Sequence, residues 1–247
     1  MLIVDADLYM YRCLSATEEE TDWGDDVWSL TSDLKIAKDL FQAQLDDFKQ
    51  TLSDDDVILC LSSKTNFRKA IDPNYKGNRK KTRKPLGFVA MQDWLQHRYR
   101  CFSKPGLEAD DCLGILSTMP DNVGKAVIVS DDKDMKTIPG KLYRPQRQEL
   151  HDITETEADL AFYTQCLVGD VTDGYSGLKG YGPKTAAKAL GTKPTWSIVE
   201  RAYMAAGLTR DDALVQARLA RILRWCDWDQ TNSRPILYTG RTNNEAA

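Results

Sequence analysis

The chain has 247 residues, of which 42% are hydrophobic, so it can bury a sizeable core as one large domain or two unequal ones. Its net charge of −4 does not indicate a nucleic-acid-binding protein, although a local basic stripe can coexist with an acidic centre. Six cysteines without a CxxC pair, and only two histidines, argue against a zinc site and favour reduced cysteines in a cytosolic protein. The N-terminus does not resemble a signal peptide, and no apolar run reaches the ~20 residues that span a bilayer.

Strands and helices are predicted to alternate over the first part of the chain. Short apolar runs predict buried strands at 2–4, 57–61 and 126–129 and further short strands at 99–102 and 141–144. Helical periodicity predicts helices at 27–52, 88–97 and 108–119, whereas the acidic stretch 17–26 is expected to be a solvated surface. This alternation predicts an α/β fold with a parallel sheet.

The second part of the chain is predicted to be helical. One helix is expected from about Thr154, where Thr154 and Glu157 form a capping-box pattern. A glycine-rich turn at 174–182 precedes a helix from about Lys184, and helices near 195–206 and 209–226 follow. We place the boundary near Gly169, which gives an α/β domain at 1–168 and a helical region at 169–247.

Acidic residues follow three of the predicted strands. Because parallel strands end at one edge of an open sheet, where such folds place their sites, these acids should converge. Either Asp110 or Asp111 alone would be interpreted as a helix N-cap, whereas several acids at one edge form a sharper pattern. The acids before the strand 57–61 lie at the opposite edge and are interpreted as a solvated turn. The converging acids are Asp5, Glu108, Asp110, Asp111, Asp131, Asp132 and Asp134, and the excluded ones are Asp54, Asp55 and Asp56.

Crowded carboxylates indicate a cation site. They repel one another, and their pKa values rise unless cations bind between them. Oxygen ligands without histidine or cysteine favour Mg²⁺ or Mn²⁺. Several carboxylates can hold two ions ~3.5–4 Å apart, which suits phosphodiester cleavage. The pattern therefore predicts a metal-dependent phosphodiesterase.

Two further segments could hold phosphates. The basic run YKGNRKKTRK at 75–84 is either a solvated surface loop or a phosphate-binding segment near the active edge. Tyr75 within it could stack on a base or pack in the core. The glycines at 174–182 are either an ordinary turn or a backbone grip on phosphate, and the following PKTAAKAL makes them similar to a helix–hairpin–helix element.

In this order, LIVDAD, YKGNR, LEADD, SDDKD and GDVTDGYSGLKGYGPKTA resemble the 5′ nuclease or flap endonuclease superfamily. The chain is most similar to the 5′→3′ exonucleases of podoviruses, from Leu2 to about Trp228. The resemblance implies a PIN-like parallel-sheet nuclease core at 1–168, with a basic arch or clamp at about 73–100. It also implies a helix–three-turn–helix DNA-binding element within 169–247.

The resemblance assigns roles to particular residues. Lys76 and Arg79 match residues that contact the scissile phosphate. Asp7 is a further candidate ligand, and Asp131 lies beside the ligand pattern. Many relatives carry another aspartate after the second strand, where this chain reads CLSSKTNF. The implied metal ligands are Asp5, Glu108, Asp110, Asp111, Asp132, Asp134, Asp170 and Asp173, and the implied DNA contacts are Tyr75, Lys80, Lys81, Arg83, Lys84, Gly177, Gly180, Gly182, Lys184 and Thr185.

The resemblance implies a divalent-metal-dependent 5′→3′ DNA exonuclease of phage replication or recombination, with flap endonuclease activity as a candidate second activity. Two Mg²⁺ or Mn²⁺ ions are the implied cofactors, with K⁺ as a candidate at the glycine hairpin. We expect a monomer in the cytoplasm of an infected host cell, acting on duplex DNA with a 5′ end, nick or flap; RNA primer–DNA hybrids and replication proteins are further candidate partners. The alternatives are a PIN-like ribonuclease and a non-catalytic relative that binds DNA structures.

Overall fold

A six-stranded sheet forms the centre of the computed structural model, which describes residues 1–240 apart from the side chains of Lys80 and Lys81. The strand order is β5-β4-β1-β6-β7-β8, and only the last pair is antiparallel. The predicted parallel α/β sheet is confirmed, whereas β8 was missed because its side chains are mostly exposed and leave no buried apolar run. The strands are β1 (Leu2–Asp5), β4 (Val57–Cys60), β5 (Cys101–Phe102), β6 (Val127–Val129), β7 (Gly140–Arg144) and β8 (Glu149–Ile153).

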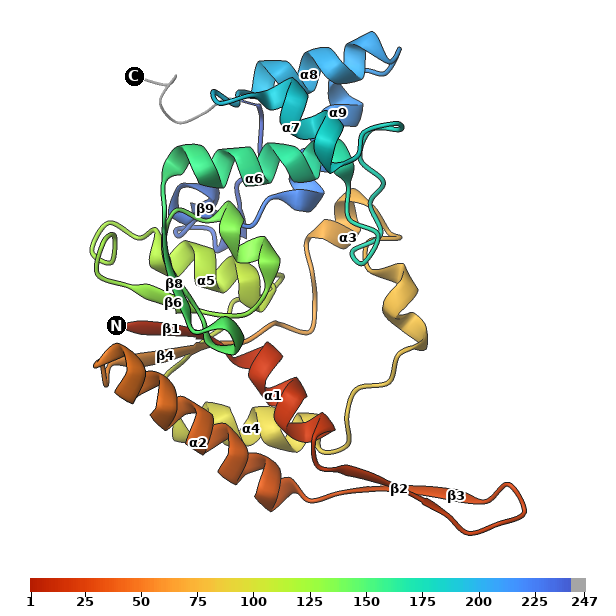
Figure 1. The fold of residues 1–247 in the computed structure, drawn as a ribbon, viewed down its shortest axis with the longest axis vertical. Helices are drawn as coiled ribbons and strands as arrows, with labels where there is room; N and C mark the ends of the chain where they lie inside the picture. Colours follow the sequence, from red (N-terminus) through yellow and green to blue (C-terminus); the bar gives the residue numbers. More distant parts are fainter. Residues whose placement is uncertain (241–247) are drawn as a thin grey trace.

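Helices cover both faces of this sheet (Figure 1). Leu2 and Val4 of β1 point into a core shared with α1 (Ala6–Ser15), α2 (Leu34–Leu52) and α4 (Phe88–Arg98). Ile3 points the other way, into a core shared with α5 (Ala109–Ser117) and the start of α6 (Glu155–Val168). Because successive side chains of a strand face opposite sides, this continuous apolar run fills two cores.

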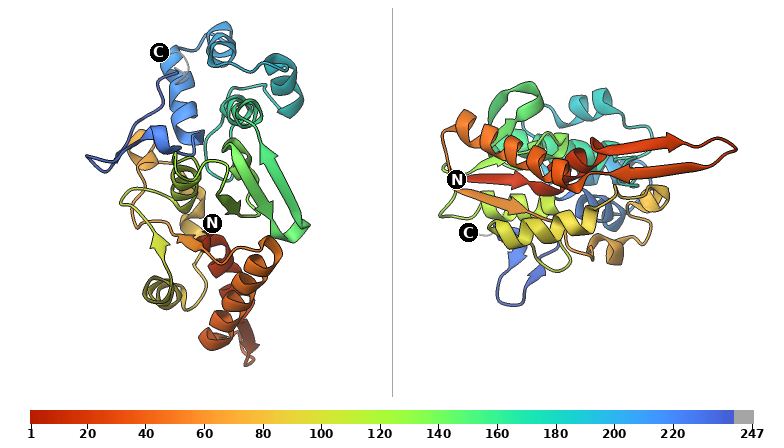
Figure 2. Two further views of the ribbon diagram at one scale, coloured as in Figure 1. Left: turned by 90° about the vertical axis from the view of Figure 1, so that its left-hand side faces the viewer. Right: turned by 90° about the horizontal axis from the view of Figure 1, so that it is seen from below.

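A two-stranded hairpin, β2 (Glu18–Asp22) and β3 (Trp28–Ser32), projects from the body between α1 and α2 (Figures 1 and 2). Its side chains are largely exposed, as expected for the acidic stretch. The prediction of a helix from residue 27 was wrong, because α2 begins only after Asp33. The Asp33 side chain accepts hydrogen bonds from the backbone of Lys35 and Ile36 and so caps the helix there.

The C-terminal helices pack beside α6 around a third core (Figure 1). The predicted capping box of Thr154 and Glu157 is confirmed at the start of α6. The predicted helix 209–226 ends early, because the chain beyond it turns back along α5. There a Cβ on Gly114 would lie 2.3 Å from the carbonyl oxygen of Leu223, so only glycine fits. These helices are α7 (Pro183–Leu190), α8 (Trp196–Ala205) and α9 (Arg210–Ala220).

Short elements complete the described chain. Two of them lie in the basic connection after β4, and one follows β6 directly. No helix within residues 1–240 is long and apolar enough to cross a bilayer. The short elements are α3 (Arg68–Ile71), η1 (Gly77–Lys81), η2 (Lys133–Thr137), η3 (Pro145–Arg147), η4 (Trp225–Asp227), β9 (Trp228–Asp229) and β10 (Arg234–Pro235).

Candidate metal and nucleic-acid site

Three carboxylates from three different strand ends lie within electrostatic reach of one another. Asp5 ends β1, Asp110 lies in the first turn of α5 after β5, and Asp132 follows β6. Burial raises the pKa of Asp5 to about 7, with a further contribution from Asp132. Burial also raises the pKa of Asp110 well above its usual range, and the charges of Asp5 and Asp132 add to the rise. The structure therefore brings these predicted ligands together at the carboxyl edge of the sheet.

A second set of carboxylates joins the loop after β6 to the loop after α6. Burial raises the pKa of Asp134 to about 7, and the charges of Asp132, Asp170 and Asp173 act in the same direction. Burial opposes ionisation of Asp170 as well, but Lys133 donates to it at 2.8 Å and lowers its pKa. These aspartates lie far apart in sequence, and the fold places their charges beside one another.

Asp111 points away from both sets, into the protein. Its side chain is fully buried and accepts two hydrogen bonds from the Arg68 guanidinium, at 2.7 and 2.8 Å. It also accepts the backbone N–H of Leu223 at 3.1 Å and that of Glu108 at 3.2 Å. These contacts use the lone pairs that a cation would need. They argue against the predicted metal-ligand role of Asp111, which instead anchors Arg68.

Glu108 connects the carboxylates to the base of the basic arch. Lys76 Nζ lies 2.5 Å from Glu108 Oε1 and 3.6 Å from Asp173 Oδ2. Arg79 Nη2 lies 2.8 Å from Asp173 Oδ1. Although burial opposes it, the charges of Arg68 and Lys76 hold the pKa of Glu108 at about 2. The predicted phosphate-contacting residues therefore lie directly beside the carboxylates.

Tyr75 cannot stack on a base in this structure, which corrects its predicted DNA contact. Its side chain is only 2% exposed. The hydroxyl donates to Glu108 Oε2 at 3.1 Å or to Asp173 Oδ2 at 3.0 Å, so it holds these two carboxylates in place.

The remaining basic residues of the arch make contacts of different kinds. Arg83 pairs with Glu18 at 2.6 Å, which ties the arch to the base of the hairpin. Lys84 Nζ lies 3.9 Å from the centre of the ring of Phe88, the first residue of α4, and makes a cation–π contact with it. The side chains of Lys80 and Lys81, both predicted DNA contacts, lie outside the described part of the chain.

The glycines of the loop between α6 and α7 have different surroundings. Gly177 donates its N–H to Gln216 at 2.9 Å, and a Cβ on it would lie 2.3 Å from the backbone nitrogen of Gly169. Gly177 is therefore used for close packing, and the predicted phosphate contact at this residue is not supported. Gly180 and Gly182 have open space around the position of a Cβ, next to the exposed Lys184 and Thr185 at the start of α7. These four remain available to a ligand.

The carboxylates are suitable ligands for a cation, but basic side chains form ion pairs with several of them in this structure. Within residues 1–240, no group of three or more His, Cys, Asp or Glu side chains already surrounds a single metal position. Glu108, Asp173 and Asp170 instead make the ion pairs with Lys76, Arg79 and Lys133 described above. The oxygen-only donor set and the strongly raised pKa values at the sheet edge fit a hard divalent cation.

The acids that were excluded from the site do lie at the opposite edge of the sheet, where Asp54 pairs with the N-terminus and Asp56 with Arg100.

The sequence analysis did not identify Arg68 and Lys133, which pair with the carboxylates of the site. Arg68 could not be distinguished by sequence from the exposed basic residues that follow it, although it is 98% shielded from solvent.

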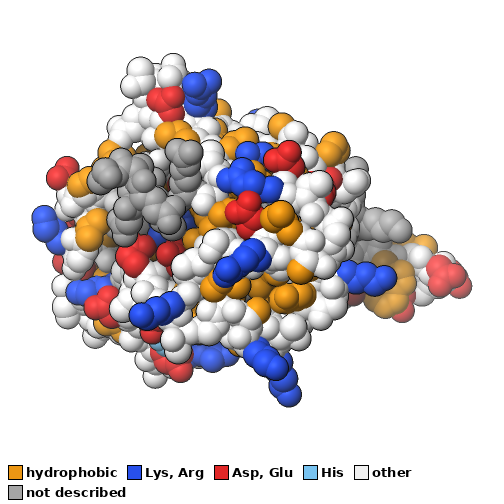
Figure 3. All heavy atoms as spheres, turned by 90° about the horizontal axis from the view of Figure 1, so that it is seen from above, with side chains coloured by type: hydrophobic (Ala, Val, Ile, Leu, Met, Phe, Trp, Pro, Cys, Tyr) orange, Lys and Arg blue, Asp and Glu red, His pale blue; other side chains and the backbone are white. Residues whose placement is uncertain are grey.

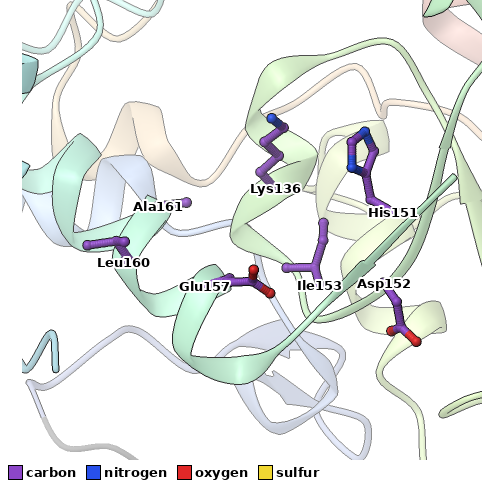
Figure 4. Close-up of a pocket in the computed structure, with 7 residues that line it drawn as sticks. All are labelled: Lys136, His151, Asp152, Ile153, Glu157, Leu160 and Ala161. Atoms are coloured by element: carbon purple, nitrogen blue, oxygen red, sulfur yellow. The ribbon is translucent and has the colours of Figure 1, made fainter. Parts of the chain in front are cut away.

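A separate pocket of about 300 Å³ lies between η2, β8 and α6 (Figure 4). It contains none of the predicted site residues, and we assign it no role. Its lining residues are Lys136, His151, Asp152, Ile153, Glu157, Leu160 and Ala161.

The fold and sequence are similar to those of known nucleases. The chain is 30% identical to the exonuclease of Escherichia phage T7, over 93% of this chain and 90% of the relative. It is 29% identical to the exodeoxyribonuclease of Enterobacteria phage T3, over 98% and 93%. The T5 5′-exonuclease with divalent zinc ions bound has the same fold, with a TM-score of 0.62, 13% identity and coverage of 89% of this chain and 88% of that one. A family model described as the 5′–3′ exonuclease N-terminal, resolvase-like domain matches residues 1–159. The chain therefore belongs to the 5′–3′ exonuclease family and is an enzyme of that family.

Proposed function

We propose that this enzyme is a divalent-metal-dependent 5′→3′ DNA exonuclease that also cleaves flap structures. The observation that supports this most directly is the placement of Lys76 and Arg79 beside the carboxylates of the sheet edge. A cation site next to side chains that can bind phosphate is what phosphodiester hydrolysis requires. The phage T7 and T3 relatives, named exonuclease and exodeoxyribonuclease, support the same reaction and DNA as its substrate.

Two groups of carboxylates would hold the cations. Asp5, Glu108, Asp110 and Asp132 would form one set of ligands, and Asp134, Asp170 and Asp173 the other. Bound divalent cations would supply Lewis-acid stabilisation of the phosphate and a nucleophile at neutral pH. The proposed cofactors are two Mg²⁺ or Mn²⁺ ions held by these carboxylates and a K⁺ ion at the glycine hairpin.

Lys76 and Arg79, at the base of the arch, would exchange their carboxylate partners for the phosphate of the substrate. Lys76 and Arg79 neutralise Glu108 and Asp173 in the structure. When cations neutralise those carboxylates instead, both basic side chains become free to bind the scissile phosphate and offset the charge that develops on it. Cation binding and substrate binding would then favour each other.

The duplex would be held by its backbone rather than by its bases. Gly180 and Gly182 lead into the N-terminus of α7, where free amides and the exposed Lys184 can contact phosphates. Lysine and arginine side chains are scattered over this helical end rather than gathered into one patch (Figure 3). We therefore propose that a few separate side chains and amides contact the duplex. We also propose that the active form is a monomer in the cytoplasm of an infected host cell.

Replacing Lys76 by alanine should slow single-turnover cleavage about 10²–10³-fold and change the Kd for DNA by less than about threefold, because its charge acts mainly on the transition state. Rapid-quench kinetics with a 5′-labelled duplex measures the first quantity, and filter binding in Ca²⁺ the second. Lys125→Ala, an exposed lysine at the opposite edge of the sheet, serves as control and should leave both unchanged. A large loss of binding with normal single-turnover cleavage would reduce Lys76 to a surface phosphate contact.

Stabilisation by Mg²⁺ should depend on pH. Asp5 and Asp134 have folded-state pKa values of about 7, above their ordinary 3.8, so their contribution to stability is complete below 3.8 and is lost as pH rises through 7. The metal-free protein should therefore lose stability from pH 5 to pH 8. Because Mg²⁺ competes with those protons, its Tm increment should be at least about twofold larger at pH 8 than at pH 5. Differential scanning fluorimetry with EDTA or Mg²⁺ checks this, and an increment that does not grow with pH would contradict it.

A Mg²⁺ titration with blunt, nicked and flapped DNA, each labelled at the 5′ or the 3′ end, tests the proposed function. We expect release of 5′-terminal products that requires the metal. Faster cleavage of matched RNA would favour a PIN-like ribonuclease, and metal-independent binding without product release would favour a non-catalytic DNA-binding protein.

A further inference from the structure

The carboxyl end of β4 differs from those of its neighbours in the sheet. β1 and β5 lead into Asp5 and Glu108, whereas no acidic residue occurs between Asp56 and Asp72. β4 pairs with both of these strands, so its end lies between their acidic residues. The row of carboxylates along the edge would be interrupted there if each strand supplied its own.

Asp7 of α1 reaches across to this position. Its Oδ2 accepts the backbone N–H of Ser62, which lies just beyond β4, at 3.1 Å. Ser62 Oγ in turn accepts the backbone N–H of Ala109, beside Glu108, at 2.9 Å. A carboxylate from a helix therefore covers the strand end that has no acid of its own.

The second oxygen of Asp7 is buried, and no hydrogen-bond partner for it exists among the described residues. Leaving a carboxylate oxygen buried without a partner costs free energy. Burial and the charge of Glu108 raise the pKa of Asp7, whereas Ser62 and the charge of Lys84 lower it. The Asp7 charge in turn raises the pKa of Asp5. A cation would satisfy the free oxygen and remove the repulsion among all three.

We propose that Asp7 is a metal ligand of the first carboxylate set, and that it supplies from α1 the oxygen that β4 does not provide. This inference rests on the proposed function, because it concerns the same divalent cation. A purely structural role is the competing explanation, since Asp7 could simply cap Ser62 and favour the first turn of α1.

Mn²⁺ binding separates the two roles without using cleavage as the readout. The experiment compares the wild type with Asp7→Asn by Mn²⁺ electron paramagnetic resonance titration and by thermal unfolding in EDTA. Asparagine keeps an acceptor for the Ser62 N–H but loses the charge. We expect at least a tenfold weaker affinity at one Mn²⁺ site and a metal-free Tm that is unchanged or higher.

Two further variants sharpen the result. Asp55→Asn makes the same change at the opposite edge and should bind Mn²⁺ like the wild type. Asp7→Asn/Ser62→Asp moves the carboxylate onto the end of β4 and should regain most of the lost affinity.

Wild-type Mn²⁺ affinity in Asp7→Asn overturns the inference, as does a lower metal-free Tm with unchanged affinity, which is the result expected of a cap. A folded double variant that binds Mn²⁺ as weakly as Asp7→Asn also counts against it. If the wild type itself bound no Mn²⁺, the proposed function would fail instead, so the two failures are distinguishable.

Discussion

Asp132→Asn should abolish cleavage, with a loss of about 10³-fold or more, while binding to duplex DNA in Ca²⁺ stays within a few-fold of the wild type. Asp132 raises the pKa values of Asp5, Asp110 and Asp134, so it is the carboxylate whose charge reaches both sets. Removing it weakens both proposed cation positions, and cations supply several kcal/mol of transition-state stabilisation. Single-turnover kinetics at saturating Mg²⁺ measures the loss.

The fold should survive this change. Asp132 Oδ1 accepts the Asp134 N–H at 2.8 Å and caps η2, and an asparagine can do the same. Asp131→Asn is the matched control, because that neighbouring carboxylate faces Arg12 and the backbone of Gln146 instead. It should lower Tm but cleave within a few-fold of the wild type. An Asp132→Asn enzyme with the wild-type rate would exclude the proposed mechanism.

Arg68→Met should destabilise the protein by about 3–5 kcal/mol, because it leaves the fully buried Asp111 without its partner. The guanidinium also donates to the carbonyl oxygens of Leu219 and Arg221, which would be left unpaired. Urea unfolding followed by circular dichroism in EDTA gives the difference in free energy of unfolding.

Two comparisons test this explanation. Arg68→Met/Asp111→Leu should regain much of the stability, since replacing a buried ion pair by apolar residues is often neutral or better. Arg100→Met removes an ion pair with Asp56 whose side chains are both about half exposed, and it should cost less than about 1 kcal/mol. Equal effects of Arg68→Met and Arg100→Met would show that burial of the pair is not decisive.

Local patterns predicted the parts of the fold that depend on apolar periodicity. The runs LIV and VILCL are β1 and β4 because a strand buried on both faces has no polar alternation. The capping box at Thr154 fixed the start of α6 for the same local reason. In contrast, α9 ends at Ala220 because Leu223 reaches Asp111 of α5, and such a tertiary contact leaves no trace in helical periodicity.

The candidate site was predictable where topology alone places a residue. Asp5, Asp110 and Asp132 follow parallel strands, so their convergence follows from the strand direction. Which way a side chain points is a different question. Asp110 and Asp111 are neighbours in sequence, yet Asp110 faces the cluster while Asp111 faces Arg68, because they lie on different sides of α5. Tyr75 was likewise open between stacking and core packing until its burial was known.

The contact between Arg68 and the C-terminal end of α9 limits how freely the two halves of this enzyme can be exchanged for those of a relative. Arg68 precedes the arch, and its guanidinium binds Asp111 of α5, which packs on the central sheet. The same guanidinium also donates to the carbonyls of Leu219 and Arg221 in the helical region. A chimaera that joined residues 1–168 to the helical half of a distant relative would have to reproduce both carbonyl positions or bury an unsatisfied guanidinium. Recombination between related genes should therefore exchange the two halves of the coding sequence together more readily than separately.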